Sequence, residues 1–285
     1  MSQNNPPLAI CYDFDGTLSP GYMQDYEFIP KIGMKSDDFW NDVTRLAEEQ
    51  HGDGILIYMG LLLRKADAAG VSVKRKNLEK FGEKIKLFKG LDDWFERINA
   101  YGHDKQINVE HYIISSGLRE LIQGTSIGKY FKEIFASGYW YDHEGVARFP
   151  AIGVNYTTKT QYLFRINKGS LNVWDREKIN RYIPDDERPI PFSNIVFFGD
   201  GDTDIPCFRL VKDQGGHAIA VYEKTKNDEG RARAFELIDQ GRVDFTVLAN
   251  YSEGSEADLL IKAIIDKTVA DRNLNQISKS FNKIN

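Results

Sequence analysis

Two aspartates separated by a single residue, Asp13 and Asp15, follow an apolar run in the segment 12–17 (Tyr-Asp-Phe-Asp-Gly-Thr). The run 8–12 lies between a Pro-Pro pair and Gly16, a pattern that predicts a buried strand ending at the aspartates. Two carboxylates at this spacing can share one site, where repulsion separates their pKa values. One can then act as a nucleophile while the other holds a proton as an acid. A simple Asp-Gly turn is the alternative interpretation.

Two further apolar runs end in polar residues of complementary kinds. The run 109–114 leads into Ser115, Ser116 and Gly117, and the run 194–198 leads into Asp200, Asp202 and Asp204. Because the carboxyl ends of parallel strands meet at one edge of a sheet, we expect these residues to converge on the paired aspartates. Clustered carboxylates need a counter-charge, and Mg²⁺ is a hard cation that prefers carboxylate and water ligands. A phosphate group bound to that cation, with the Ser115 hydroxyl and nearby backbone N–H groups as donors, would complete the charge balance.

The three aspartates at 200, 202 and 204 also match the opening of an EF-hand calcium loop. That interpretation fails further along the segment, because the sixth position is Ile205 instead of glycine and the twelfth is Val211 instead of glutamate. We therefore interpret the segment as part of the converging site.

The order of these segments resembles the signature of the haloacid dehalogenase superfamily, whose members are mostly phosphatases. The residues that match its first, second and fourth parts are Asp13 with Asp15, Ser115, and Asp200 with Asp204. The third part of the signature is a lone lysine. Lys159 is the stronger candidate because Thr157 or Thr158 can cap a helix there, and Lys168 is the second candidate.

The resemblance implies a role for each matching residue. Asp13 would attack phosphorus and form an aspartyl-phosphate, and Asp15 would protonate the leaving oxygen and then activate water. The implied phosphate ligands are Ser115, Ser116, Gly117 and Lys159. The implied Mg²⁺ ligands are Asp13, the backbone carbonyl of Asp15, and Asp200, with Asp204 either as a further ligand or as a residue that contacts one. An aspartate at position 15 favours phosphoryl chemistry over dehalogenation, which needs no acid for the leaving group.

The rest of the chain predicts an α/β fold with a doubly wound, mostly parallel sheet, because strand-like runs alternate with helical patterns from residue 109 onward. Residues 36–105 show helical patterns without a convincing strand. We expect an α/β core in residues 1–20 and 103–272, an inserted α-helical cap domain in 21–102 and a polar C-terminal tail in 273–285. A helical cap in this interval is similar to that of the phosphoserine phosphatase-like branch of the superfamily.

Composition restricts the compartment and the partners. The net charge of −5, without a run of lysines and arginines, argues against a nucleic-acid partner. The longest apolar stretch, residues 55–63, falls well short of the roughly 20 residues that span a bilayer, and the N-terminus has no signal-peptide pattern. Cys11 and Cys207 stand in apolar contexts, which is typical of packed, reduced thiols. We therefore expect a cytoplasmic protein that binds no membrane.

These features together predict a Mg²⁺-dependent hydrolase of a small phosphorylated metabolite. Two alternatives stay open: a phosphotransferase or phosphomutase of the same fold, and a non-catalytic sensor of a phosphorylated ligand. The intact Asp13 and Asp15 pair argues against a sensor, because a binding protein gains nothing from a nucleophile beside an acid. Neither the substrate's identity nor the oligomeric state follows from the sequence.

Overall fold

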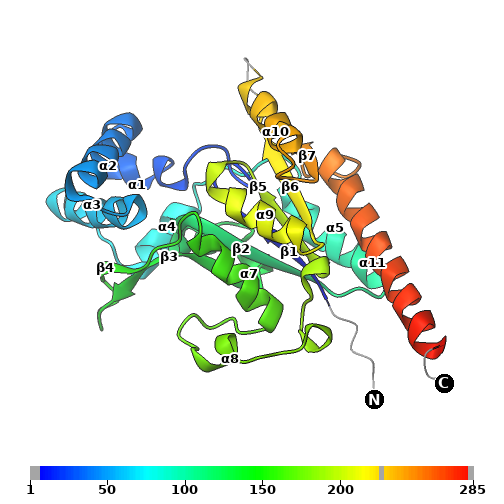
Figure 1. Cartoon of the computed structure of the whole chain (residues 1–285). Coiled ribbons are helices and arrows are strands. Elements are labelled where there is room, and N and C mark those ends of the chain that lie inside the picture. The colour runs from blue at the N-terminus through cyan, green and yellow to red at the C-terminus, as the bar shows by residue number, and fades with distance from the viewer. Residues whose placement is uncertain (1–6, 225–227, 282–285) are drawn as a thin grey trace.

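A seven-stranded sheet forms the centre of the protein, whose computed structural model describes residues 7–224 and 228–281 (Figure 1). The strands are β1 (Leu8–Tyr12), β2 (Val109–Leu118), β3 (Glu133–Tyr141), β4 (Ala147–Ile152), β5 (Ile195–Gly199), β6 (His217–Tyr222) and β7 (Phe245–Leu248). Their order across the sheet is β4-β3-β2-β1-β5-β6-β7. Strands β3 and β4 pair antiparallel, and the other neighbours pair parallel. The predicted α/β fold with a mostly parallel sheet is confirmed.

Helices cover both faces of the sheet because successive side chains of a strand point to opposite sides. On β1, Leu8, Ile10 and Tyr12 enter one apolar cluster, whereas Ala9 and Cys11 enter the other. The first cluster also holds α5 (Leu91–Asp104), α6 (Arg119–Gly124) and α11 (Glu256–Phe281), and the second holds α7 (Thr158–Lys168), α9 (Ile205–Asp213) and α10 (Glu229–Asp239). The sheet is therefore doubly wound, and both cysteines are buried free thiols, as predicted.

The helical segment between β1 and β2 divides into parts with different neighbours. Helices α1 (Phe28–Lys31), α2 (Ser36–Gln50) and α3 (Gly54–Ala68) lie together at one end of the molecule, near β4 (Figure 1). Helix α4 (Arg75–Gly82) packs against α6, and α5 packs on β2 and α11. This packing places α5 with the core, although the expected cap domain extends to residue 102. An amphipathic pattern shows that a helix has a buried face, but it does not say which surface covers that face.

Two other boundaries differ from expectation. The sequence pattern predicts a short strand at 134–136 and a separate hairpin at 139–154, but β3 runs without interruption from Glu133 to Tyr141, so the short strand and the first arm of the hairpin are one strand. Helix α11 continues to Phe281, so residues 273–281 of the expected polar tail are helical, and their polar composition reflects exposure of the helix. Residues 282–285 of that tail, and residues 1–6 at the N-terminus examined for a signal peptide, lie outside the described residues.

The long segment between α7 and β5 contains α8 (Glu177–Asn180) and is anchored by a buried arginine. The guanidinium of Arg165 donates to the carbonyls of Asn172 at 2.8 Å and Val173 at 3.0 Å. Over residues 7–224 and 228–281, no helix combines the length and the apolar character needed to cross a bilayer.

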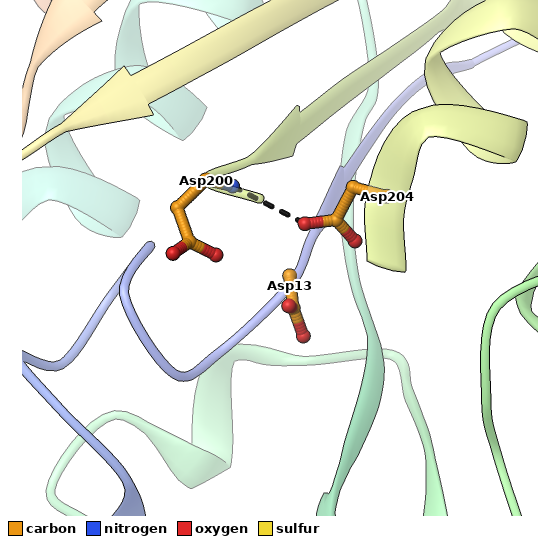
Figure 2. A group of neighbouring side chains, drawn as sticks. All are labelled: Asp13, Asp200 and Asp204. Atoms are coloured by element: carbon orange, nitrogen blue, oxygen red, sulfur yellow. Dashed lines mark hydrogen bonds between the residues drawn. The ribbon is translucent and has the colours of Figure 1, made fainter. Parts of the chain in front are cut away.

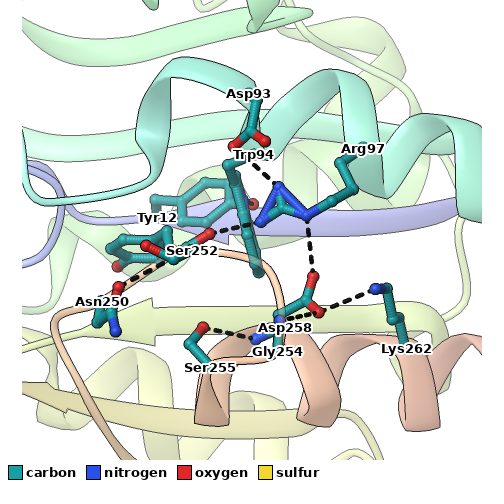
Figure 3. A network of polar contacts seen from close by, with 11 residues as sticks. Tyr12, Asp93, Trp94, Arg97, Asn250, Ser252, Gly254, Ser255, Asp258 and Lys262 are labelled. Atoms are coloured by element: carbon teal, nitrogen blue, oxygen red, sulfur yellow. Dashed lines mark hydrogen bonds and ion pairs between the residues drawn. The ribbon is translucent and has the colours of Figure 1, made fainter.

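A polar network fixes the loop that follows β7 (Figure 3). Arg97 on α5 donates to the carbonyl of Tyr251 at 2.6 Å and pairs with Asp258 on α11 at 3.3 Å, and Lys262 also pairs with Asp258, at 2.9 Å. The hydroxyl of Tyr251 in turn donates to the carbonyl of Thr17 at 2.7 Å. The network therefore braces the turn that carries the paired aspartates.

Candidate active site

The register of the central strands brings the three predicted segments together. Tyr12 at the end of β1 pairs with Ile113 on β2 and with Phe198 on β5, so Asp13, Ser115 and Asp200 lie at nearly the same level of the sheet. The N–H of Asp13 continues this ladder by donating to the carbonyl of Phe198 at 2.8 Å. The residues that follow β1 and β5 and the segment 115–117 near the end of β2 therefore converge at one edge of the sheet.

Three carboxylates meet at this edge (Figure 2). One oxygen from each of Asp13, Asp200 and Asp204 lies within 4.8 Å of the other two. The Oδ2 atom of Asp204 accepts the N–H of Asp200 at 3.2 Å, which orders the turn after β5. Gly16 passes directly beside Asp200: its φ is +76°, and a Cβ there would lie 2.1 Å from a carboxylate oxygen. Any larger residue at position 16 would displace Asp200 from the cluster.

The ionised forms of the carboxylates in this cluster are electrostatically unfavourable. Burial raises the pKa of Asp200 well above its ordinary value, and the charges of Asp204 and Asp13 raise it further. Burial, followed by repulsion from Asp13, raises the pKa of Asp204 to about 7. Both shifts arise because carboxylates leave water and stand beside like charges. The cluster therefore favours a bound cation.

A buried lysine supplies part of the missing positive charge. Lys159 extends from the first turn of α7, and its side chain is fully buried. Its Nζ atom lies 2.9 Å from Oδ2 of Asp13 and 2.7 Å from Oδ1 of Asp204. Burial alone would lower the pKa of Lys159, but the charges of Asp13 and Asp204 outweigh it and raise that pKa above its ordinary value. The ammonium is therefore a permanent cation between two aspartates.

The structure brings only one of the two candidate lysines to the aspartates. Lys168 lies at the far end of α7, roughly 13 Å along the helix axis from the first turn. Its Nζ donates to the carbonyl of Ile179 at 2.8 Å. The expected threonine cap takes another form: Thr157 at the N-cap makes no side-chain bond to the helix, whereas Oγ1 of Thr158 accepts the N–H of Asn155 at 2.7 Å.

Asp15 is oriented by the short 3₁₀ turn η1 (Met23–Asp25). Its Oδ1 atom accepts the N–H of Met23 at 2.9 Å. Burial raises the pKa of Asp15 well above its ordinary value, and the charge of Asp13 is the second cause of this rise. Asp15 therefore favours its protonated form, which is the form that a general acid needs.

The predicted phosphate-binding segment forms a bulge. The β2–β3 register shifts between Ser115 and Leu118, so Ser116 and Gly117 leave the ladder. The N–H of Gly117 donates to Oγ of Ser115 at 3.1 Å, and the hydroxyl proton of Ser115 can still serve another acceptor. Gly117 packs directly against Met23, because a Cβ there would lie 2.0 Å from Cε of that side chain.

Some contacts of the site were not indicated by the sequence. The hydroxyl of Tyr58 on α3 donates to the carbonyl of Ser116 at 2.8 Å, and Met23 bonds Asp15 as described. An aromatic residue on an amphipathic helix looks like any core residue, so no sequence signal marked it. Asp202, which was expected among the converging carboxylates, is exposed and pairs with Arg233 on α10.

The comparisons with known proteins agree with this geometry. The family model described as haloacid dehalogenase-like hydrolase matches residues 10–209. An uncharacterized protein of Borreliella burgdorferi is 29% identical over 283 residues, which cover 90% of this chain and 95% of that protein.

Solved structures share the fold at low sequence identity. A haloacid dehalogenase family hydrolase from Salmonella enterica serovar Typhi has a TM-score of 0.57 and 19% identity, over 92% of this chain and 72% of that one. A substrate-bound phosphoserine phosphatase has a TM-score of 0.51 and 18% identity, over 84% of this chain and 92% of that one. A phosphoserine phosphohydrolase-like protein from Francisella tularensis has a TM-score of 0.50 and 18% identity, over 88% and 97%. Because the matched segment spans the aspartates from Asp13 to Asp204, and the sheet assembles them at one edge, this chain belongs to the haloacid dehalogenase-like hydrolase family.

Proposed function

We propose that this hydrolase is a Mg²⁺-dependent phosphatase that cleaves a small phosphorylated metabolite in the cytoplasm through an aspartyl-phosphate. The observation that carries the proposal is the pairing of two unlike aspartates. Asp13 contacts the buried ammonium of Lys159 at 2.9 Å, whereas burial raises the pKa of Asp15, two residues further on. A nucleophile paired with an ammonium, beside a protonated acid, is the combination that cleavage of a phosphoester needs.

The proposed reaction has two steps. An oxygen of Asp13 attacks phosphorus while the ester P–O bond breaks, and Asp15 gives its proton to the leaving alcohol. Asp15, now ionised, then takes a proton from water as the water oxygen attacks the aspartyl-phosphate, which releases inorganic phosphate and regenerates Asp13. The bond from the N–H of Phe14 to Oδ1 of Asp13, at 2.8 Å, holds the nucleophile in one orientation. The segment 115–117 and Lys159 would bind the phosphoryl oxygens.

The carboxylate cluster fits a divalent cation such as Mg²⁺. Asp13, Asp200 and Asp204 each offer an oxygen within 4.8 Å of the others, and the backbone carbonyl of Asp15 would add a fourth ligand. The raised pKa values of Asp200 and Asp204 reflect negative charge that Lys159 does not fully offset. When bound, the cation would neutralise that charge and the charge of the phosphate.

Two segments between β1 and β2 contact the candidate site and support a compact substrate. The turn η1 contacts Asp15 through the N–H of Met23, and α3 contacts the carbonyl of Ser116 through Tyr58. Contacts of this kind limit the space and the water around a site, and they favour a compact substrate. The fold similarity to a phosphoserine phosphatase supports a phosphorylated small alcohol as the first substrate class to test.

Phosphate release from a panel of phosphorylated metabolites, with Mg²⁺ and with EDTA, tests the proposal. We expect metal-dependent turnover, and we expect Asp13→Asn to lower kcat by about 1,000-fold or more because the nucleophile is lost. Turnover that Asp13→Asn leaves intact would refute the mechanism. Transfer of the phosphoryl group to an added alcohol in place of water would favour a phosphotransferase, and ligand binding without turnover in the unaltered protein would favour a sensor.

A further inference from the structure

The carbonyl of Ser116, inside the phosphate-binding segment, is held by two side chains. The hydroxyl of Tyr58 on α3 donates to this oxygen at 2.8 Å, and Oγ of Ser137 on β3 donates to it at 3.0 Å. Tyr58 is 2% exposed. Burial raises the pKa of Tyr58, and hydrogen bonding to Ser137 and Gln24 offsets only part of that shift. The hydroxyl therefore keeps its proton and acts as a donor.

The bulge in β2 explains why this carbonyl needs side-chain donors. Ser116 and Gly117 leave the β2–β3 ladder, and a buried carbonyl without a partner is destabilising. Tyr58 and Ser137 supply the donors that the ladder does not. Because the C=O of Ser116 and the N–H of Gly117 belong to one planar peptide unit, fixing the oxygen also fixes the direction of that N–H.

We propose that Tyr58 is a positioning residue that couples the packing of α3 to the shape of the phosphate-binding segment 115–117. The inference rests on the proposed function, which assigns this segment to phosphate. While α3 is packed against the core, Tyr58 orients the peptide between Ser116 and Gly117. When α3 moves away, the carbonyl loses one of its two donors and the segment loses the conformation that suits a phosphate.

The chain contains a matched control for this role. Tyr139 on β3 is also buried, and its hydroxyl donates to the carbonyl of Met59 at 3.0 Å. Met59 follows Tyr58 on α3, so both hydroxyls join α3 to the core. Tyr58 donates from α3 to β2, whereas Tyr139 donates from β3 to α3. Only the bond of Tyr58 ends on the segment 115–117. Removing either hydroxyl weakens the contact with α3, but only Tyr58→Phe frees the carbonyl of Ser116.

Inhibition by orthovanadate, an analogue of the transferring phosphoryl group, measures the expected difference. Loss of one buried hydrogen bond should raise the inhibition constant of orthovanadate by about 3- to 10-fold in Tyr58→Phe. Tyr139→Phe should change it by less than about 2-fold, since its contact lies outside the segment. Equal increases in the two variants would show that Tyr58 acts only by holding α3, and no increase in Tyr58→Phe would also overturn the proposal.

Hydrogen exchange provides a second test that needs no turnover. Peptides that cover residues 115–118 should exchange faster in Tyr58→Phe than in the unaltered protein, and Tyr139→Phe should leave them unchanged. If the unaltered protein cleaves no ester and binds no orthovanadate, the proposed phosphatase function fails. The exchange comparison would still decide the coupling: unchanged exchange in Tyr58→Phe overturns it.

Discussion

The substitution Lys159→Met is expected to destabilise the metal-free protein strongly. Methionine keeps an apolar stem of similar length but removes an ammonium that lies, fully buried, 2.9 Å from Asp13 and 2.7 Å from Asp204. Removing one partner of a buried ion pair typically costs about 3–5 kcal/mol because an uncompensated charge stays behind. The repulsion energy between Asp13 and Asp204, once the ammonium is gone, is of similar size. Unit charges about 4 Å apart interact by about 4 kcal/mol at an effective dielectric constant near 20.

Protonation of Asp204 limits this cost and gives it a pH dependence. The pKa of Asp204 is about 7 in the presence of Lys159, whose charge lowers it, so the pKa must rise further in Lys159→Met. A neutral Asp204 no longer repels Asp13. The difference in free energy of unfolding between the two proteins should therefore be larger at pH 8 than at pH 6.

Urea unfolding in EDTA at pH 8 and pH 6 measures this difference. Lys168→Met is the matched control, because it removes a lysine from the same helix whose Nζ donates only to backbone carbonyls. We expect it to cost about 1 kcal/mol or less at both pH values. The reasoning would be refuted if Lys159→Met were as stable as Lys168→Met at pH 8, or if its deficit grew as the pH fell.

Three further outcomes follow from the geometry. Mg²⁺ should bind more weakly as the pH falls below about 7, because protons compete for Asp204, whose pKa is about 7. Calorimetric titrations at pH 8 and pH 6 test this expectation. A pH-independent affinity would place the cation elsewhere. Gly16→Ala should weaken Mg²⁺ binding about 10-fold or more in the same titration, because the new Cβ would lie 2.1 Å from an oxygen of Asp200. An unchanged affinity would exclude Asp200 as a ligand. Burial lowers the pKa of His111 from 6.5 to about 3, so the unfolded chain binds a proton that the folded protein does not, and this stability is lost as the pH falls from about 6.5 toward 3. Between pH 7 and pH 5 the unaltered protein should lose about 2 kcal/mol relative to His111→Gln in urea unfolding, because the aspartates of the site titrate alike in both proteins, and an equal change in the two proteins would contradict it.

The sheet and the segments that end its central strands could be predicted because their signals are local. An apolar run followed by polar residues marks a strand, and Asp13, Ser115 and Asp200 each stand within two residues of the end of such a run, although β2 continues past Ser115 to Leu118. The partners of helices could not be predicted in this way. The pattern of α5 is the same whether it covers α3 or β2, and only the packing shows that it lies on β2.

The choice between the two lysines also depended on tertiary structure. Lys159 and Lys168 lie on one helix, and residue type does not distinguish them. The position of α7 relative to β1 decides that Lys159 reaches Asp13 while Lys168 bonds the loop around Ile179. The contact of Tyr58 with Ser116 is of the same kind, because it joins residues that are 58 positions apart.

The charges at the site decide between the two interpretations that the paired aspartates allow. An Asp-Gly turn needs no buried partner, because its carboxylates face water. Here Asp13, Asp200 and Asp204 bring three negative charges together when ionised, and Lys159 contributes one positive charge. The two negative charges that remain equal the charge of one divalent cation. A phosphate then requires donors of its own, and the bulged segment 115–117 stands at the same sheet edge. This balance favours metal-assisted phosphoryl chemistry over a turn.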